Sequence, residues 1–235
     1  MTEPAFVLHT RPWSETSLIA ELLTPGQGRL GVMSRGGRRG RRGAAPALQP
    51  FTLLQTDWRG RGELRTLTVA EPERHFRLQG DWLYAGLYLN ELLLRLLERD
   101  DAQPGIFKAY ALALVALADM TDLEPPLRRF ELHLLEALGY GFPLDRDIDG
   151  AEVRPGTDYE LLRDSGLAPA GPLAVRDGPE PVRFAGAHLL ALAADDFSAP
   201  AVRLAAKRLT RAALAQHLGG RPLRSRELFR TRTGG

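Results

Sequence analysis

The residues with the clearest chemical potential are arginines in a stretch of the chain that lacks acidic residues. Between Leu22 and Thr56 the sequence contains six arginines and no aspartate or glutamate. They are Arg29, Arg35, Arg38, Arg39, Arg41 and Arg42. Guanidinium groups on a glycine-rich segment can follow a phosphate backbone and stack on bases. We therefore predict a nucleic-acid contact on a long loop at residues 35–50, and a merely solvated loop is the alternative.

Three aromatic residues of the same region offer a second kind of contact. Trp13, Phe51 and Trp58 can either stack on bases or pack in a protein core. For Phe51 we favour the core, whereas for the two tryptophans both interpretations stay open.

A second basic group accompanies apolar residues in the C-terminal half. Arg128 and Arg129 lie close in sequence to Leu132 and Leu135. Later basic residues also recur at helical spacing: Arg203, Lys207, Arg208 and Arg211. Basic side chains around an apolar groove can receive an acidic peptide with an aromatic anchor. The alternative is that the leucines belong to the core and the arginines are solvated.

Two nucleotide-binding patterns lack the context that they require. Gly26, Gly28 and Gly31 match the spacing of a dinucleotide fingerprint, but they fall in a predicted hairpin without a following acid at the right distance. The only lysines, Lys108 and Lys207, do not follow a glycine, which excludes a P-loop.

Acidic residues and histidines also give no convincing catalytic or metal site. Asp145, Asp147 and Asp149 match the start of a calcium loop, but its twelfth position is Gly156 instead of glutamate. We interpret them as a solvated loop, and a metal-dependent phosphodiesterase built on them is the last-ranked hypothesis. The five histidines lack the spacing of metal ligands: His9, His75, His133, His188 and His217. We expect no enzyme, no metal and no cofactor.

Composition sets the limits for these patterns. The chain has 235 residues, 31 Lys and Arg, 29 Asp and Glu, and no cysteine. The lack of cysteine excludes disulfides, thiolate zinc sites and cysteine nucleophiles, and a 44% hydrophobic share suffices for a sizeable core. No apolar run has the roughly 18 residues of a membrane span, and no secretory signal is visible. We therefore expect a cytoplasmic protein without a membrane partner.

The net charge of +2 conceals an uneven distribution. Residues 1–70 hold 10 basic and 5 acidic residues, residues 71–200 hold 12 and 23, and residues 201–235 hold 9 and 1. Two basic ends around an acidic middle are typical of a polyanion binder.

The predicted secondary structure that would position these residues changes from strands to helices near residue 80. Turn signals separate five short predicted strands, at Ala5–His9, Ser17–Thr24, Arg29–Ser34, Phe51–Trp58 and Glu63–Ala70. Helical periodicity then predicts Asp81–Glu98, Gly105–Met120, Pro125–Leu138, Ala187–Asp195, Pro200–Leu218 and a short turn at Ser225–Arg230. We expect Asp81 as an N-cap, Pro126 in a first turn and Gly139 just past a helix end. Residues 140–183 are predicted to be irregular, with short strands near Leu173–Val175 and Val182–Phe184.

Ordered motifs along nearly the whole chain resemble the bacterial RecO recombination-mediator family. They are Phe6–Leu18, Gly28–Leu30, Arg35–Gly36, Leu48–Thr52, Gly60–Leu64, Tyr84–Leu92, Leu127–Leu132, Leu138–Gly141 and Leu218–Leu228. The resemblance is weakest across residues 142–183. Many family members carry a four-cysteine zinc site there, and this chain, which has no cysteine, departs from that pattern.

The resemblance implies an α+β fold with an N-terminal five-stranded OB-fold barrel and an all-helical C-terminal domain. We place the OB-fold domain at residues 1–79 and the helical domain at 80–235, with an irregular insertion at about 141–184. It further implies binding to single- and double-stranded DNA, annealing of complementary strands, and contact with the C-terminal tail of the single-stranded DNA-binding protein (SSB). Together with RecR, such proteins help RecA to load onto SSB-coated strands, so we expect a nucleoid-associated protein.

Residues for each role follow from these arguments. The expected DNA-binding set is Arg11, Trp13, Arg29, Arg35, Arg38, Arg39, Arg41, Arg42, Arg59 and Arg61. The expected SSB-tail set is Arg128, Leu132, Leu135, Arg203, Lys207 and Arg208. A general module that binds RNA or single-stranded DNA, without a role in recombination, is the alternative function.

Overall fold

A computed structural model describes residues 2–35, 48–171 and 182–230 of the chain. It contains two compact units. The first comprises Met1–Leu123 together with Leu223–Gly235, and the second comprises Glu124–Pro222. The chain therefore leaves the first unit and returns to it at its C-terminal end. The predicted domain division at residues 79/80 stays a prediction.

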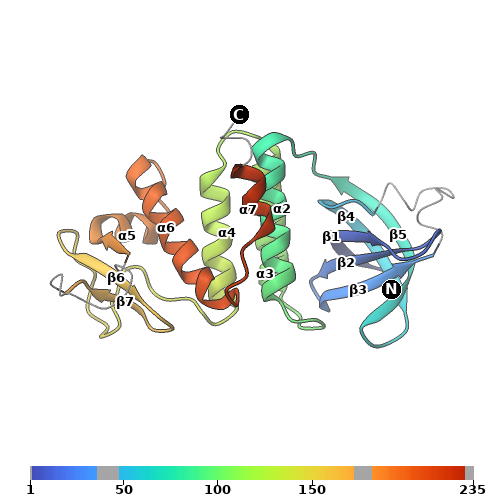
Figure 1. Cartoon of the computed structure of the whole chain (residues 1–235), viewed down its shortest axis with the longest axis horizontal. Helices are drawn as coiled ribbons and strands as arrows, with labels where there is room; N and C mark the ends of the chain where they lie inside the picture. Colours follow the sequence, from blue (N-terminus) through green and yellow to red (C-terminus); the bar gives the residue numbers. More distant parts are fainter. Residues whose placement is uncertain (1, 36–47, 172–181, 231–235) are drawn as a thin grey trace. The chain divides into compact units, whose positions relative to one another are not determined.

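A closed five-stranded barrel forms the N-terminal part of the first unit (Figure 1). Its strands are β1 (Glu3–Pro12), β2 (Leu18–Thr24), β3 (Gly28–Ser34), β4 (Thr52–Arg59) and β5 (Leu64–His75). Their order around the barrel is β1-β2-β3-β5-β4, with β3 and β5 parallel and the other pairs antiparallel. This order is that of an OB-like barrel, so the predicted strands and fold class are confirmed.

Alternating small and branched side chains fill the barrel. Ala20 and Leu22 on β2 and Leu30 and Val32 on β3 are buried, as the two-residue period of a strand requires. Phe51 is 4% exposed, which confirms that it is a core residue. Trp58 is partly buried and packs against the barrel cluster that includes Ala20 and Leu22.

The glycine pattern of the sequence lies in the turn between β2 and β3, as expected. Gly28 has a φ of +67°, and a Cβ there would come within 1.7 Å of the carbonyl oxygen of Asp101. Gly28 is therefore required both by its left-handed backbone conformation and by the close approach of the backbone at Asp101.

Among the described residues, three helices complete the first unit: α2 (Gly80–Leu96), α3 (Pro104–Ala118) and α7 (Arg224–Arg230). The predicted N-cap at Asp81 is wrong, because the helix begins one residue earlier with Gln79 in the capping position. Asp81 instead lies in the first turn, where its charge complements the helix dipole.

A buried polar chain joins the barrel to these helices. Asn90 of α2 is 2% exposed, and its amide donates to the carbonyl oxygen of Leu8 on β1 at 2.7 Å. The fully buried hydroxyl of Tyr110 on α3 donates to the amide oxygen of Asn90. Phe6 packs edge-on against Tyr110, with ring centroids 5.1 Å apart. These contacts satisfy polar groups that would otherwise destabilise the interior.

The C-terminal helix α7 is held by a carboxylate on α2. Glu91 accepts hydrogen bonds from the backbone N–H groups of Arg224 and Ser225 and from the Ser225 hydroxyl, at 2.6–2.9 Å. Burial opposes ionisation of Glu91, but these hydrogen bonds outweigh it and lower its pKa. Glu91 thus caps the start of α7 from another helix.

The second unit combines three helices with a small sheet. It contains α4 (Glu124–Ala137), β6 (Asp158–Leu162), β7 (Gly166–Pro169), β8 (Arg183–Ala185), α5 (Gly186–Ala193) and α6 (Pro200–His217). Figure 1 shows β6 and β7 side by side, and the sheet has the order β7-β6-β8. A hydrophobic cluster includes Tyr159 of β6, Phe184 of β8 and Leu209 of α6.

Most predicted features of this unit are present. Pro126 lies in the first turn of α4, and Gly139 follows its end with a φ of +78°. The N–H groups of Gly139 and Tyr140 donate to the carbonyls of Glu136 and Leu135, which is a glycine-terminated helix end. The predicted irregular stretch also contains β6 and β7, which periodicity did not indicate. Of the two strands expected there, the later corresponds to β8, and Leu173–Val175 lies outside the described residues.

We predict that Asn90→Leu lowers the free energy of unfolding by about 2–4 kcal/mol, because it strands the Leu8 carbonyl and the Tyr110 hydroxyl in the interior. Urea denaturation measures this loss. The double variant with Tyr110→Phe should lose less than the sum of the two single changes, since one stranded group is then absent. Additive losses would show that the three groups do not act together.

Candidate nucleic-acid and peptide-binding sites

One end of the barrel carries an exposed arginine and tryptophan. Trp13 follows β1 and is 58% exposed, and the Arg11 guanidinium lies 5.9 Å from its ring centroid. The register pairs Pro12 with Leu18 and Leu18 with Ser34, so exposed Arg35 after β3 belongs to the same end of the sheet. An exposed ring beside cations is the arrangement that stacks bases and contacts phosphates.

The other predicted barrel arginines are distributed differently. Arg59 and Arg61 are exposed in the turn between β4 and β5. Because Thr56 pairs with Glu3, this turn lies toward the beginning of β1, whereas Trp13 follows its end. Arg38, Arg39, Arg41 and Arg42 lie outside the described residues, so their assignment stays a prediction.

Arg29 is engaged within the chain. Its Nε donates to the carbonyl oxygen of Leu97 at 3.1 Å, and its Nη1 lies 3.4 Å from Glu21. Burial lowers the pKa of Arg29, against the opposing effect of Glu21. Glu21 also pairs with Arg99, whose Nη1 donates to the carbonyl of Glu63 at 2.9 Å. Arg29 thus joins the barrel to the segment after α2.

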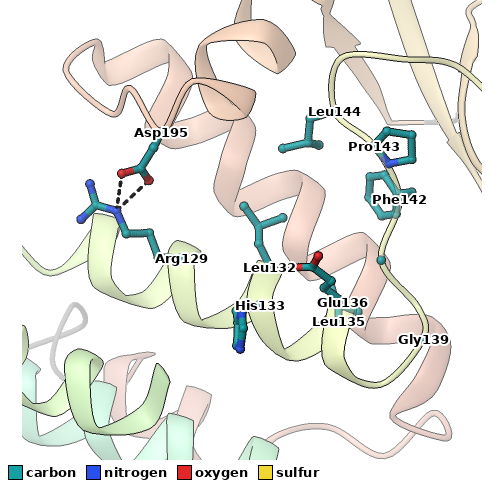
Figure 2. Close-up of a pocket in the computed structure, with 11 residues that line it drawn as sticks. Arg129, Leu132, His133, Leu135, Glu136, Gly139, Phe142, Pro143, Leu144 and Asp195 are labelled. Carbon is teal, nitrogen blue, oxygen red and sulfur yellow. Dashed lines mark hydrogen bonds and ion pairs between the residues drawn. The ribbon is translucent and has the colours of Figure 1, made fainter. Parts of the chain in front are cut away.

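A cavity of about 590 Å³ lies in the second unit, beside α4 (Figure 2). Apolar side chains supply much of its lining, and the predicted Leu132 and Leu135 are among them. The residues around it are Arg129, Leu132, His133, Leu135, Glu136, Gly139, Gly141, Phe142, Pro143, Leu144 and Asp195. Its charged groups include one arginine, Arg129, which is 52% exposed.

Arg129 is held at the cavity by one carboxylate. Its Nε donates to both Asp195 oxygens, at 2.7 and 3.0 Å. Its guanidinium also lies 5.2 Å from the centroid of the Phe197 ring. Its terminal nitrogens, Nη1 and Nη2, have no partner within the described part of the chain. An arginine with unused donors beside apolar side chains can bind an acidic ligand that carries a ring.

The neighbouring Arg128 has a different environment. It is 3% exposed, and its Nη1 lies 3.0 Å from Glu131 and 3.2 Å from the Thr210 hydroxyl. Its Nε lies 3.6 Å from Glu124, and Glu131 is completely buried. The Arg128 guanidinium therefore fastens α4 to α6 and cannot meet a ligand without leaving these partners.

The three basic residues expected on α6 also have partners within the unit. Arg203 donates to the carbonyl of Phe197 at 2.5 Å, and Lys207 lies 2.6 Å from Glu124. The Arg208 guanidinium is 6.0 Å from the Phe184 ring centroid. Within the described residues, none of the three borders the cavity.

Sequence reasoning placed Arg129 near the apolar groove but did not select it, and it missed Phe142, Leu144 and Asp195. Helical periodicity could have separated the two arginines, because Arg128 and Glu131 share the buried face of α4 with Leu135. No local signal pointed to Asp195, which reaches the cavity from the end of another helix.

The described residues show neither a membrane-spanning helix nor a metal cluster. In that part of the chain no helix is long and apolar enough to cross a bilayer. It also contains no group of three or more His, Asp or Glu residues that could hold a metal ion. Asp147 instead accepts the backbone N–H groups of Asp149 and Ala151, at 3.0 and 2.9 Å. Without cysteine, residues 142–183 do not fit a thiolate zinc site.

We predict that Arg128→Ala lowers the free energy of unfolding by about 3–5 kcal/mol, because it leaves the buried Glu131 without its cation. The neighbouring change Arg129→Ala is the control and should alter stability by no more than about 0.5 kcal/mol. Urea denaturation compares the two variants. Arg128→Met combined with Glu131→Leu should recover much of the loss, and equal effects of the two arginine changes would contradict this assignment.

Comparisons with known proteins agree over the whole chain. A family model described as "Recombination protein O N terminal" matches residues 1–76, and one described as "Recombination protein O C terminal" matches residues 77–227. The chain is 50% identical over 232 residues to the DNA repair protein RecO of Pseudomonas aeruginosa, which covers 98% of this chain and 95% of that protein. The RecO protein of Stutzerimonas stutzeri is 48% identical, and the match covers 97% of this chain and 93% of that protein. The RecO protein of Methylococcus capsulatus is 46% identical, and the match covers 98% of this chain and 93% of that protein. The chain therefore belongs to the RecO family of non-enzymatic DNA repair and recombination proteins.

Proposed function

We propose that this protein is an ATP-independent recombination mediator. It binds single- and double-stranded DNA, anneals complementary strands and, together with RecR, helps RecA to load onto SSB-coated strands. The observation that carries the proposal is the OB-like barrel, whose exposed Trp13 and Arg11 lie at one end with Arg35. Family membership supports the same function.

The barrel provides the contacts for a flexible strand. Trp13 offers a ring face to any base, while arginines neutralise phosphates without reading sequence. The arginine-rich segment that begins at Arg35 extends this contact, and the turn with Arg59 and Arg61 offers a further one. Two strands neutralised on one surface repel each other less, so pairing proceeds faster without nucleotide hydrolysis.

The cavity beside α4 provides the contact for the SSB tail. An acidic segment that ends in phenylalanine presents a ring, for which Leu132, Leu135 and Phe142 form the apolar lining. Its carboxylates meet Arg129, the exposed cation of this site. Arg128 supports this site from inside the unit by fixing α4.

Changing Arg38, Arg39, Arg41 and Arg42 to alanine should flatten the dependence of DNA affinity on salt. Each lost phosphate contact on a single strand reduces the slope of log K against log salt by about 0.7. Fluorescence anisotropy with a labelled oligonucleotide, across a salt series, measures the slope. The same variant should anneal SSB-coated complementary strands more slowly than the wild type.

Three outcomes would contradict this assignment. An unchanged slope would show that the four arginines are not the electrostatic contact. Equal affinity for RNA and DNA of one sequence would favour a general nucleic-acid binder. Annealing no faster than with SSB alone would exclude the mediator function itself.

Arg129→Gln should weaken binding of a fluorescent peptide that is rich in aspartate and ends in phenylalanine. Loss of a charge-assisted contact predicts an increase in Kd of about tenfold. Arg163→Gln is the control, because Arg163 is 78% exposed, also pairs with an acidic neighbour and does not line the cavity. Equal weakening by both changes would mean that only the overall charge matters, and no binding to the wild type would refute the site.

A further inference from the structure

We propose that Asp195 acts as a built-in competitor at the peptide cavity: its carboxylate occupies the edge of Arg129 that faces a carboxylate approaching from the apolar lining. This inference rests on the proposed peptide-binding function of the same cavity. It makes Asp195 a residue that determines affinity and selectivity there, with no need for a second ligand.

Asp195 pairs with Arg129 through one nitrogen. Both oxygens of Asp195 accept from Nε of Arg129, and Asp195 itself belongs to the cavity lining. In Figure 2 the Nε edge of Arg129 is turned to Asp195, while its terminal nitrogens point to the side away from Leu132. A ligand carboxylate that approaches from the apolar lining therefore meets the negative charge of Asp195 first, and it must displace that charge or pass around it.

Asp195 ends α5 in the left-handed conformation, which aspartate tolerates better than most other residues. Asp195 follows the end of α5, where its N–H donates to the carbonyl of Leu192 at 3.0 Å and the N–H of Asp196 donates to that of Ala191 at 2.9 Å. This is the same helix ending that α4 makes with Gly139, but here the left-handed residue is an aspartate with a φ of +56°.

Two features make this residue unfavourable for the helix itself. Glycine is the usual residue at a left-handed position, because a side chain adds strain there. A negative charge at a helix C-terminus also opposes the helix dipole. Residues that break local rules in this way are commonly found at functional sites. The contact with Arg129 is the interaction that favours a carboxylate here.

A ligand carboxylate can replace Asp195 at Arg129 without a large loss of free energy. The side chains of Arg129 and Asp195 are 52% and 63% exposed, and solvent-exposed ion pairs are individually weak. An isolated carboxylate therefore gains little by replacing Asp195. A ligand with several carboxylates and a ring gains more, because the ring adds apolar contact and further charges can reach the unused Nη1 and Nη2. The competitor thus favours acidic peptides over single anions.

The test is a titration of the full-length protein with a fluorescent, aspartate-rich peptide that ends in phenylalanine. Asp195→Asn keeps the shape of the side chain and tolerates the left-handed backbone, and it should lower Kd about two- to fivefold. Asp195→Gly should tighten binding in the same direction and also raise the melting temperature, since glycine suits the backbone. The decrease in Kd should disappear when Arg129→Gln is added to either variant.

Asp196→Asn is the matched control. It removes the same charge one residue away, but Asp196 accepts from the N–H of Ser198 at 2.9 Å and does not line the cavity. Equal tightening by Asp195→Asn and Asp196→Asn would overturn the proposal, because only the overall charge would then matter. Weaker binding by Asp195→Asn would also overturn it and would make Asp195 a residue that positions Arg129. Absence of binding by every variant would refute the peptide site itself, which is a distinguishable result.

Discussion

The buried guanidinium of Arg128 is the constraint on which the cavity beside α4 depends. A charge at this depth is unfavourable unless it is paired, and here Glu131, Glu124 and Thr210 surround it. Glu131 is equally buried, so neither group can leave without exposing the other to an apolar interior. Arg128 and Glu131 both lie on α4, and the Arg128 Nη1 reaches the Thr210 hydroxyl of α6, which fixes the face that α4 turns to α6. Because successive helical residues are rotated by about 100°, the same register turns Arg129 outward.

In the first unit, both neutral and charged polar groups join the barrel and the helices. Asn90 links the barrel to α2 and α3 without any charge, whereas Arg29, Glu21 and Arg99 form an ionic cluster at the segment after α2. Glu91 then receives α7, which arrives from the far end of the sequence. The C-terminal helix α7 therefore packs on α2, and residues 124–222 are inserted in the sequence between α3 and α7.

Local sequence signals predict much of this architecture, but some contacts depend on the fold and could not be predicted. Two-residue periods and turn glycines are local signals, so the barrel strands and the turn at Gly28 were predictable. The strands β6 and β7 are short and pair across an irregular region, and no local period marks them. Arg128 and Arg129 are identical in type and adjacent, so their roles depend on which face of α4 is buried. Asp195 meets Arg129 from 66 residues away, a contact that only the fold creates.

The uneven charge distribution along the sequence becomes weaker when charges are counted by compact unit. The compact units hold 19 basic and 15 acidic residues in the first, and 12 and 14 in the second, so the sharp blocks of the sequence become a moderate contrast. Basic residues of α6 neutralise acids of α4 within the second unit, as Lys207 does with Glu124. The second unit thus has no positive surplus with which to attract an acidic peptide at long range. At the proposed peptide site, recognition then depends on Arg129 and the apolar lining beside it, whereas the proposed DNA contact of the barrel can use a surplus of arginines to attract a polyanion.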